Sequence, residues 1–176
     1  MTEIVIREAA AADIPALHRL IESAYRGEAS RAGWTTEADL LAGQRTDPDD
    51  LAGILADPAQ VLLTAWRGDE LLGCVLIADR GGGTGYFGML SVRPTLQGGG
   101  LGRRLVETAH AELARRFGAR RVRISVFPQR DTLIAWYRRL GYVPTGETLP
   151  FPYDDPRFGL PLRDDLHFIV MERPLA

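Results

Sequence analysis

Residues 92–104 read VRPTLQGGGLGRR, and the fold that we predict for the chain follows from this stretch. The run before it, residues 86–92, is short, apolar and preceded by glycines, which is typical of a central strand. Apolar residues recur every three or four positions over residues 101–117, which predicts an amphipathic helix ending at Gly118. A glycine-rich turn thus joins a strand to a long helix. Backbone N–H groups converge at such a turn, beside the positive end of the helix dipole, and can bind a phosphate there.

Arginine side chains strengthen the prediction of an anion at this turn. Arg103 and Arg104 fall in the first turn of the predicted helix, where a cation opposes the dipole and costs roughly 0.3–1 kcal/mol. The chain has no lysine and a net charge of −2. Residues 1–88 carry 7 arginines and 14 acidic residues, whereas residues 89–176 carry 14 arginines and 9 acidic residues. A local excess on an acidic chain favours one anionic ligand site over a nucleic-acid surface.

Other phosphate-binding motifs do not fit the sequence. A Walker motif needs a lysine, which the chain lacks. The pattern that starts Gly98-x-Gly100 departs from the dinucleotide motif at Arg103. Residues 83–88 match G-x-G-x-x-G literally but precede a strand instead of following one, so we interpret that match as chance.

Predicted strands and helices alternate along the rest of the chain, which indicates a mixed α/β domain. The length of 176 residues fits a single domain, residues 1–176. Asp131 is the expected N-cap of the last helix. Residues 26–44 are expected to be irregular or weakly helical, and residues 150–165, with four prolines, to form a long, stiff loop. The remaining predicted strands cover residues 4–7, 60–66, 71–78, 122–126, 142–145 and 167–171, and the remaining predicted helices cover residues 13–25, 48–56 and 131–140.

Several classes of protein are excluded by composition. No uncharged stretch approaches the roughly 18 residues of a membrane span, and residues 1–7 lack the features of a signal peptide, so we expect a cytoplasmic protein. Cys74 is the single cysteine and is expected to be a buried core residue. His18, His110 and His167 have no ligand-like spacing, so we expect no metal site.

Two motifs resemble those of one family. Gln97-x-x-Gly100-x-Gly102 after a strand resembles the pyrophosphate-binding motif of the GNAT family of N-acetyltransferases. Residues 135–142 (AWYRRLGY) are similar to a second motif of that family and follow the next predicted strand, as they should. The resemblance is good over about residues 62–144.

The resemblance implies a fold and a co-substrate. The fold is a mixed, mostly antiparallel central sheet with a splayed strand pair and flanking helices. The co-substrate is acetyl-CoA, whose pantetheine arm pairs with the backbone of Leu90 and Val92. Arg130, which stands where relatives often have asparagine, is expected to contact a phosphate. The other expected cofactor-binding residues are Gln97, Gly98, Gly99, Gly100, Gly102, Arg103 and Arg104.

The resemblance also implies two catalytic groups. The backbone amide of Leu90 stabilises the oxyanion, and Tyr137 protonates the departing thiolate. Where many relatives have a glutamate as general base, this chain has Tyr86, and tyrosine, with a pKa of about 10, is a poor base at neutral pH. The base is therefore unassigned. The candidates are Glu28, Glu37 and His167.

The acceptor is expected to bind between residues 25–37 and residues 150–167, because loops over strand ends carry specificity. Aromatic and acidic side chains in the first of these segments suit a small cationic amine. The expected acceptor-binding residues are Tyr25, Glu28, Trp34, Glu37, Tyr86 and His167.

The sequence thus predicts a monomeric or homodimeric acetyl-CoA-dependent N-acetyltransferase that acts on the primary amine of a small molecule. Nucleic acid and membrane are not expected as partners. An acceptor amine on a peptide or protein is an alternative, and so is a non-catalytic domain that binds or senses acyl-CoA.

Overall fold

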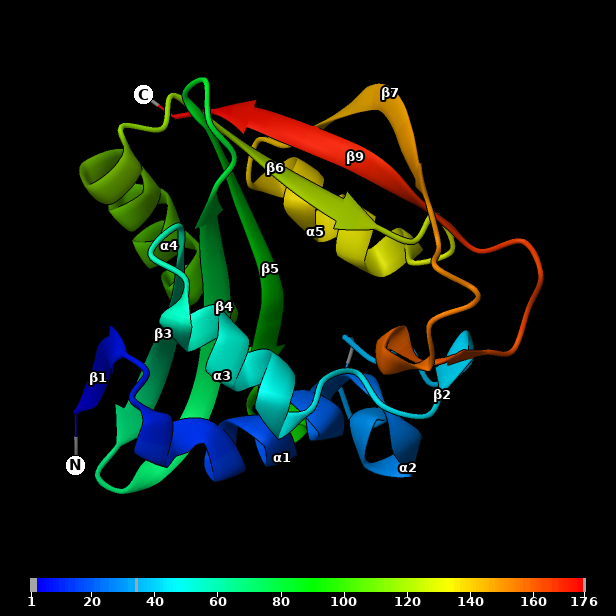
Figure 1. Ribbon diagram of the computed structural model, residues 1–176, viewed down its shortest axis with the longest axis horizontal. Helices are drawn as coiled ribbons and strands as arrows, with labels where there is room; N and C mark the ends of the chain where they lie inside the picture. Colours follow the sequence, from blue (N-terminus) through cyan, green and yellow to red (C-terminus); the bar gives the residue numbers. More distant parts are fainter. Residues whose placement is uncertain (1–2, 34, 176) are drawn as a thin grey trace.

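A seven-stranded sheet forms the centre of the molecule within residues 3–33 and 35–175, which the computed structural model describes (Figure 1). Its β5–β6 pair is parallel, and the other neighbouring strands in the sheet are antiparallel. The predicted mixed, mostly antiparallel sheet is therefore confirmed. In sheet order, the strands are β1 (Ile4–Glu8), β3 (Gln60–Arg67), β4 (Glu70–Asp79), β5 (Thr84–Val92), β6 (Arg121–Val126), β9 (His167–Pro174) and β7 (Val143–Pro150).

Helices pack on both faces of the sheet. One face carries α1 (Ile14–Tyr25) and α3 (Pro48–Ala56), and the other carries α4 (Leu101–Phe117) and α5 (Asp131–Arg139). Because both faces are covered, the middle of β4 is buried continuously instead of alternating between buried and exposed residues. Cys74 lies in this strand and is fully buried, as predicted.

The predicted helix over residues 101–117 has the bounds of α4, but the C-terminal region differs from the prediction. β7 continues to Pro150, past the predicted end at residue 145. An edge strand can include proline because one side of its backbone needs no ladder partner, and β7 is at the edge of the sheet.

A small second sheet joins the segment predicted as irregular or weakly helical, residues 26–44, to the predicted long loop, residues 150–165. In it β2 (Leu41–Ala42) pairs antiparallel with β8 (Leu160–Pro161), next to α2 (Gly27–Ser30) and the short helix η3 (Pro156–Phe158). The backbone N–H of Leu162 also donates to Leu40 O at 2.9 Å. Two-residue strands carry no periodicity, so local sequence could not predict this pairing.

The predicted cap of α5 is displaced by one residue. The N-cap of α5 is Arg130, and Asp131 is the first helical residue. A carboxylate at that position still faces the positive end of the helix dipole, which explains why the residue type is favourable there.

β5 and β6 are paired over only part of their length. The parallel register joins Thr84–Tyr86 to Arg121–Arg123. β5 continues to Val92 while β6 and β9 follow a diverging course (Figure 1). The separation leaves an opening in the middle of the sheet.

A bulge in β5 lies along this opening. The register between β4 and β5 shifts between Cys74 and Leu76, and Met89 has a φ of 51°, which is uncommon for a residue with a side chain. An extra residue reverses the faces to which the following side chains point. Phe87 and Leu90 consequently pack in the same core as α4, although they are three residues apart.

The close approach of β4 to α4 predicts a stability difference between two glycine variants. A methyl group at Gly73 would lie 2.8 Å from Ser91 O and 2.9 Å from a Leu105 methyl carbon. Gly73→Ala should lower the free energy of unfolding by roughly 1–3 kcal/mol because the core is overpacked. Gly53 lies on the exposed side of α3 with open space around it. Gly53→Ala should therefore raise the free energy of unfolding by roughly 0.4–1 kcal/mol. Urea denaturation measures both, and equal effects would contradict this packing.

The partly buried ring of His110 predicts a pH dependence of stability. Its Nε2 lies 2.6 Å from the Tyr142 hydroxyl, and burial lowers the pKa of His110 from 6.5 to about 4. Between these pH values the unfolded chain binds a proton at His110 that the folded chain does not. The free energy of unfolding therefore decreases as the pH falls from 6.5 toward 4. Thermal denaturation from pH 7 to pH 4 should show a shallower loss for His110→Gln. An unchanged dependence of the melting temperature on pH in His110→Gln would contradict the lowered pKa of His110.

Candidate active site

A cavity of about 280 Å³ lies at the opening between β5 and β6. Strand residues and α5 form one side of it, and the segments that contain β2 and η3 close the other. Six of the predicted site residues line this cavity: Tyr25, Glu37, Tyr86, Leu90, Arg130 and Tyr137. Most of its wall is apolar or aromatic. The phenylalanines in the wall are Phe87, Phe127, Phe151, Phe158 and Phe168.

Tyr137 projects from α5 into an aromatic cluster. Its ring packs edge-on against Phe87 and Tyr142, with ring centroids 5.8 and 5.7 Å away. Desolvation by burial raises the pKa of Tyr137 well above its ordinary value. The hydroxyl is therefore protonated at neutral pH and can act as a proton donor.

Tyr25 fixes the bulge from the other side. Its hydroxyl donates a hydrogen bond of 2.5 Å to Leu90 O. Burial raises the pKa of Tyr25 to about 12, so this donor also keeps its proton. The bond ties the end of α1 to the strand residue predicted to contact the reacting group.

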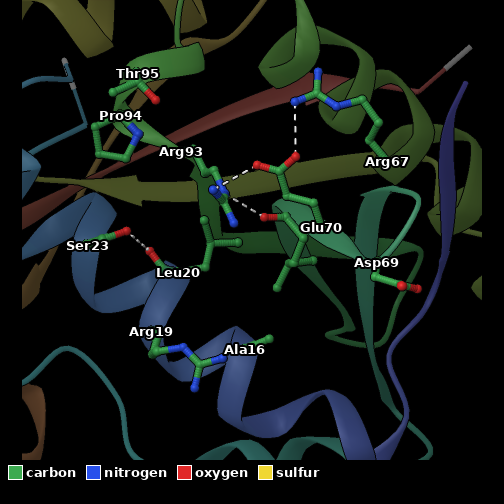
Figure 2. Close-up of a pocket in the computed structure, with 11 residues that line it drawn as sticks. Ala16, Arg19, Leu20, Ser23, Arg67, Asp69, Glu70, Arg93, Pro94 and Thr95 are labelled. Carbon is green, nitrogen blue, oxygen red and sulfur yellow. Dashed lines mark hydrogen bonds and ion pairs between the residues drawn. The ribbon is translucent and has the colours of Figure 1, made fainter. Parts of the chain in front are cut away.

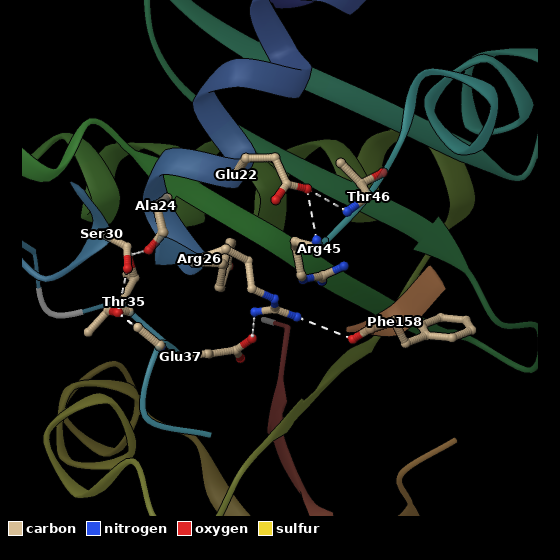
Figure 3. A network of polar contacts seen from close by, with 12 residues as sticks. Glu22, Ala24, Arg26, Ser30, Thr35, Glu37, Arg45, Thr46 and Phe158 are labelled. Carbon is tan, nitrogen blue, oxygen red and sulfur yellow. Dashed lines mark hydrogen bonds and ion pairs between the residues drawn. The ribbon is translucent and has the colours of Figure 1, made fainter. Parts of the chain in front are cut away.

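A buried group of charges lines the cavity, and Figure 3 shows its members Arg26 and Glu37. Glu37 accepts from Arg26 Nη1 at 2.6 Å through one carboxylate oxygen and from Arg130 Nη1 at 3.2 Å through the other. The three side chains are only 5–10% exposed. Arg26 also donates to Phe158 O at 3.2 Å, and Arg130 donates to Thr35 O at 2.5 Å. These contacts therefore join the segment around Phe158 to the end of α1, and the segment around Glu37 to the start of α5.

Arg45 is a third arginine in the cavity wall. Glu22 holds its backbone by accepting from the N–H groups of Arg45 and Thr46 at 2.8 and 2.9 Å (Figure 3). The guanidinium carbon of Arg45 lies 5.2 Å from the centroid of the Tyr25 ring. Arg45 forms no ion pair within the described part of the chain.

The predicted phosphate-binding turn lies between the short helix η2 (Pro94–Leu96) and α4. Gly98 and Gly100 have φ values of 91° and 89°, and no atom lies within 4 Å of the position where a side chain would start. Exposed backbone therefore surrounds an open space that side chains would fill. The Gln97 side chain braces the turn by donating to Thr35 Oγ1 and Val92 O.

The two arginines after this turn point in different directions. Arg103 is exposed and pairs with Glu107 at 3.0 Å. Arg104 donates to Ile4 O in β1, at the far edge of the sheet from β6. Successive helical residues are about 100° apart around the axis, so the two side chains cannot share one ligand contact easily.

Two other predicted residues, Glu28 and His167, lie outside the cavity wall. Glu28 has an 89% exposed side chain that pairs with Arg31, and it does not line the cavity. His167 begins β9, outside the cavity wall, with Nδ1 3.4 Å from Asp165 O. Arg130 lines the cavity, where it pairs with Glu37 and donates to Thr35 O. Trp34 is outside the described residues.

The prediction missed Arg26, Arg45 and most of the phenylalanines in the wall. Arg26 and Arg45 fall in a segment of weak pattern, where an arginine ordinarily indicates a solvated surface. Only the tertiary contacts with Tyr25 and Glu37 bring them together.

A second, larger hollow of about 760 Å³ shares no lining residue with this cavity. It lies between α1 and the β3–β4 turn (Figure 2). Glu70 pairs there with Arg67 and Arg93, and all three side chains are more than 40% exposed. The larger hollow therefore has solvated ion pairs and no aromatic residue among the described residues of its wall, and it does not offer the buried charges and aromatic rings of the first cavity.

Among residues 3–33 and 35–175, no cluster of three or more metal-ligating side chains occurs. No helix in the same part of the chain combines the length and the apolar character needed to cross a membrane.

Comparisons with known proteins agree with this architecture. The sequence profile of the acetyltransferase (GNAT) family matches residues 15–142. An "IAA acetyltransferase" of Azospirillum brasilense is 35% identical over 122 residues, which cover 69% of this chain and 72% of the relative. A Salmonella typhimurium protein solved with its cofactor acetyl-CoA superposes with a TM-score of 0.70 and 22% identity, covering 98% of this chain and 94% of the other. A Vibrio cholerae spermidine N-acetyltransferase solved with CoA and spermine gives a TM-score of 0.70 at 15% identity, covering 98% and 95%.

The profile match spans most of the sequence, and the chain therefore belongs to the GNAT family of acetyltransferases. It is an N-acetyltransferase. The predicted family resemblance is thus confirmed.

The buried charges predict a large effect for one conservative variant. Glu37→Gln leaves two buried guanidinium groups without their counter-charge, which should cost roughly 3–5 kcal/mol of unfolding free energy. Proteolysis near Phe158 should accelerate because the covering segment loses its anchor. Asp39→Asn, which removes an exposed pair with Arg31, is the control and should change stability little. Equal effects would show that Glu37 is not the anchor.

Proposed function

We propose that the protein transfers the acetyl group of acetyl-CoA to the primary amine of a small molecule. The observation that carries this proposal is the cavity at the opening between β5 and β6, whose wall includes Tyr137. The β2–β8 pair and the Arg26–Phe158 hydrogen bond close this cavity on the acceptor side. A cavity of about 280 Å³ suits a small acceptor better than a folded protein chain.

The residues present fit acetyl-CoA. The glycine turn offers backbone N–H groups and open space to a pyrophosphate. The edge of β5 beyond Tyr86 is free of β6 and can pair with a pantetheine arm in the manner of an added strand. When bound, acetyl-CoA supplies the thioester from which the acetyl group is transferred.

In this proposal the chain supplies orientation, electrostatic stabilisation and one proton. The backbone N–H of Leu90 stabilises the charge that develops on the thioester oxygen. Tyr137 gives its proton to the sulfur as the C–S bond breaks and the N–C bond forms. The amine releases one proton to solvent, and the tyrosinate takes one proton from solvent, so charge and protons balance. The products are an acetamide and free CoA.

None of the three candidate bases suits direct contact with the amine. Glu28 and His167 lie outside the cavity wall, and both oxygens of Glu37 are occupied by arginines. We therefore propose that the amine binds in its neutral form, without a carboxylate base in the wall.

The variant Tyr137→Phe tests whether Tyr137 is the general acid that protonates the sulfur. It removes one hydroxyl and keeps the packed ring, so kcat should fall roughly 10²-fold or more while the CoA dissociation constant stays unchanged. Free thiol released from acetyl-CoA in the presence of an amine panel measures turnover, and calorimetry measures CoA binding.

Tyr142→Phe is the matched control. It removes a hydroxyl from the same aromatic cluster without touching the cavity, and its kcat should remain close to that of the unaltered protein. Near-normal turnover of Tyr137→Phe would assign Tyr137 to the core. Absence of CoA binding would overturn the proposed function itself.

A further inference from the structure

The charge of the cavity wall is opposite to the charge expected from the sequence. Among the described residues, Arg26, Arg45 and Arg130 line the cavity, and Glu37 is the acidic residue that faces them. Glu37 compensates one of the three positive charges. An acceptor whose only charged groups are ammonium ions would enter a wall with a surplus of positive charge, which is unfavourable.

An unsatisfied donor accompanies this surplus. The Arg26 side chain is 5% exposed, and its Nε–H is buried with no hydrogen-bond partner. A buried N–H without a partner costs free energy, and such a group in a native protein calls for a reason, such as a functional role or a bound water or ion. The Arg45 guanidinium stacks on Tyr25 in the same wall, with no carboxylate paired to it in the described chain. Both groups are donors that a carboxylate accepts from.

The remainder of the wall has a different chemistry. Phe127 stacks on Phe168 with ring centroids 4.6 Å apart, and Phe151 lies 6.0 Å from Phe127. Leu41 and Met89 add further apolar surface. This part of the cavity suits an apolar or aromatic group, while the arginines suit an anion.

We propose that the acceptor is a primary amine that also bears a carboxylate next to an apolar or aromatic side chain, which is the chemistry of an apolar α-amino acid. Arg45 and the free Nε–H of Arg26 bind the carboxylate, and the phenylalanines contact the side chain. This inference rests on the proposed acetyl transfer, but it concerns a separate property, the recognition of the acceptor. Arg130 remains committed to Glu37 and Thr35 and holds the covering segment.

Acceptors matched in shape test the role of the carboxylate. L-Phenylalanine and phenethylamine differ only by that group, as do L-leucine and 3-methylbutylamine. The kcat/KM of each amino acid should exceed that of its decarboxylated partner by roughly 100-fold, mainly through KM, because the site's buried donors are left unpaired by the amine. Spermidine should be a poor acceptor.

Variants of Arg45 test whether this residue binds the carboxylate of the acceptor. Arg45→Glu should abolish or reverse the preference, and Arg45→Lys should retain part of it because the charge remains. Arg19→Gln, on the exposed side of α1 and outside the cavity, should keep the full preference. Circular dichroism and thermal denaturation confirm that each variant is folded.

A binding measurement separates this inference from the proposed function. Calorimetric titration of the CoA-saturated protein should show N-acetyl-L-phenylalanine binding at least roughly tenfold more tightly than N-acetylphenethylamine, and Arg45→Glu should remove the difference. Turnover of the simple amines as fast as the amino acids, or equal binding of the two products, would overturn the carboxylate inference while acetyl transfer stands. If neither amine nor amino acid releases CoA, acetyl transfer fails, and the binding difference still decides the carboxylate site.

Discussion

The incomplete pairing of β5 with β6 is the constraint on which the rest of the structure depends. Two adjacent strands that part within a sheet leave backbone N–H and C=O groups without ladder partners. A ligand arm that pairs as an added strand can satisfy them, and a cavity forms where the arm ends. The bulge at Met89 turns Leu90 toward the α4 face, and the hydrogen bond from Tyr25 holds it from the opposite side. The backbone is thus shaped before any substrate arrives.

The acceptor side is held together by charge, whereas the sheet is held together by apolar packing. Glu37 bridges Arg26 from the end of α1 and Arg130 from the start of α5, and Arg26 reaches the carbonyl of Phe158. Buried pairs of this kind contribute little net stability, because desolvation offsets the attraction. Their directional hydrogen bonds do fix the positions of the two covering segments. We infer that the arginines set the geometry of the cavity more than they stabilise the fold.

The sequence predicted those features that depend on neighbouring residues. Apolar periodicity located α4, and the glycine turn and the segment around Tyr137 were found because a motif is local in sequence. Contacts between distant segments could not be predicted in the same way. Glu28 and Glu37 looked equivalent in a one-dimensional charge count, yet Glu28 is solvated and Glu37 is neutralised by arginines from two elements. The expected cationic acceptor followed from the aromatic and acidic residues of that segment, whereas three arginines of the described chain line the cavity together with Glu37.

The surplus of positive charge in the cavity wall affects how acetyl transfer can proceed without an assigned general base. An amine attacks a thioester only when it is neutral, and nearby positive charges lower the pKa of an ammonium group because they disfavour the protonated form. With an acceptor carboxylate bound, the wall of Arg26, Arg45, Arg130 and Glu37 still carries one positive charge in excess. The apolar and aromatic part of the wall excludes water, which strengthens that effect relative to bulk water. The arginines that attract the carboxylate can therefore also favour the reactive form of the amine, which explains how Tyr86 can occupy the strand position where many relatives carry a glutamate.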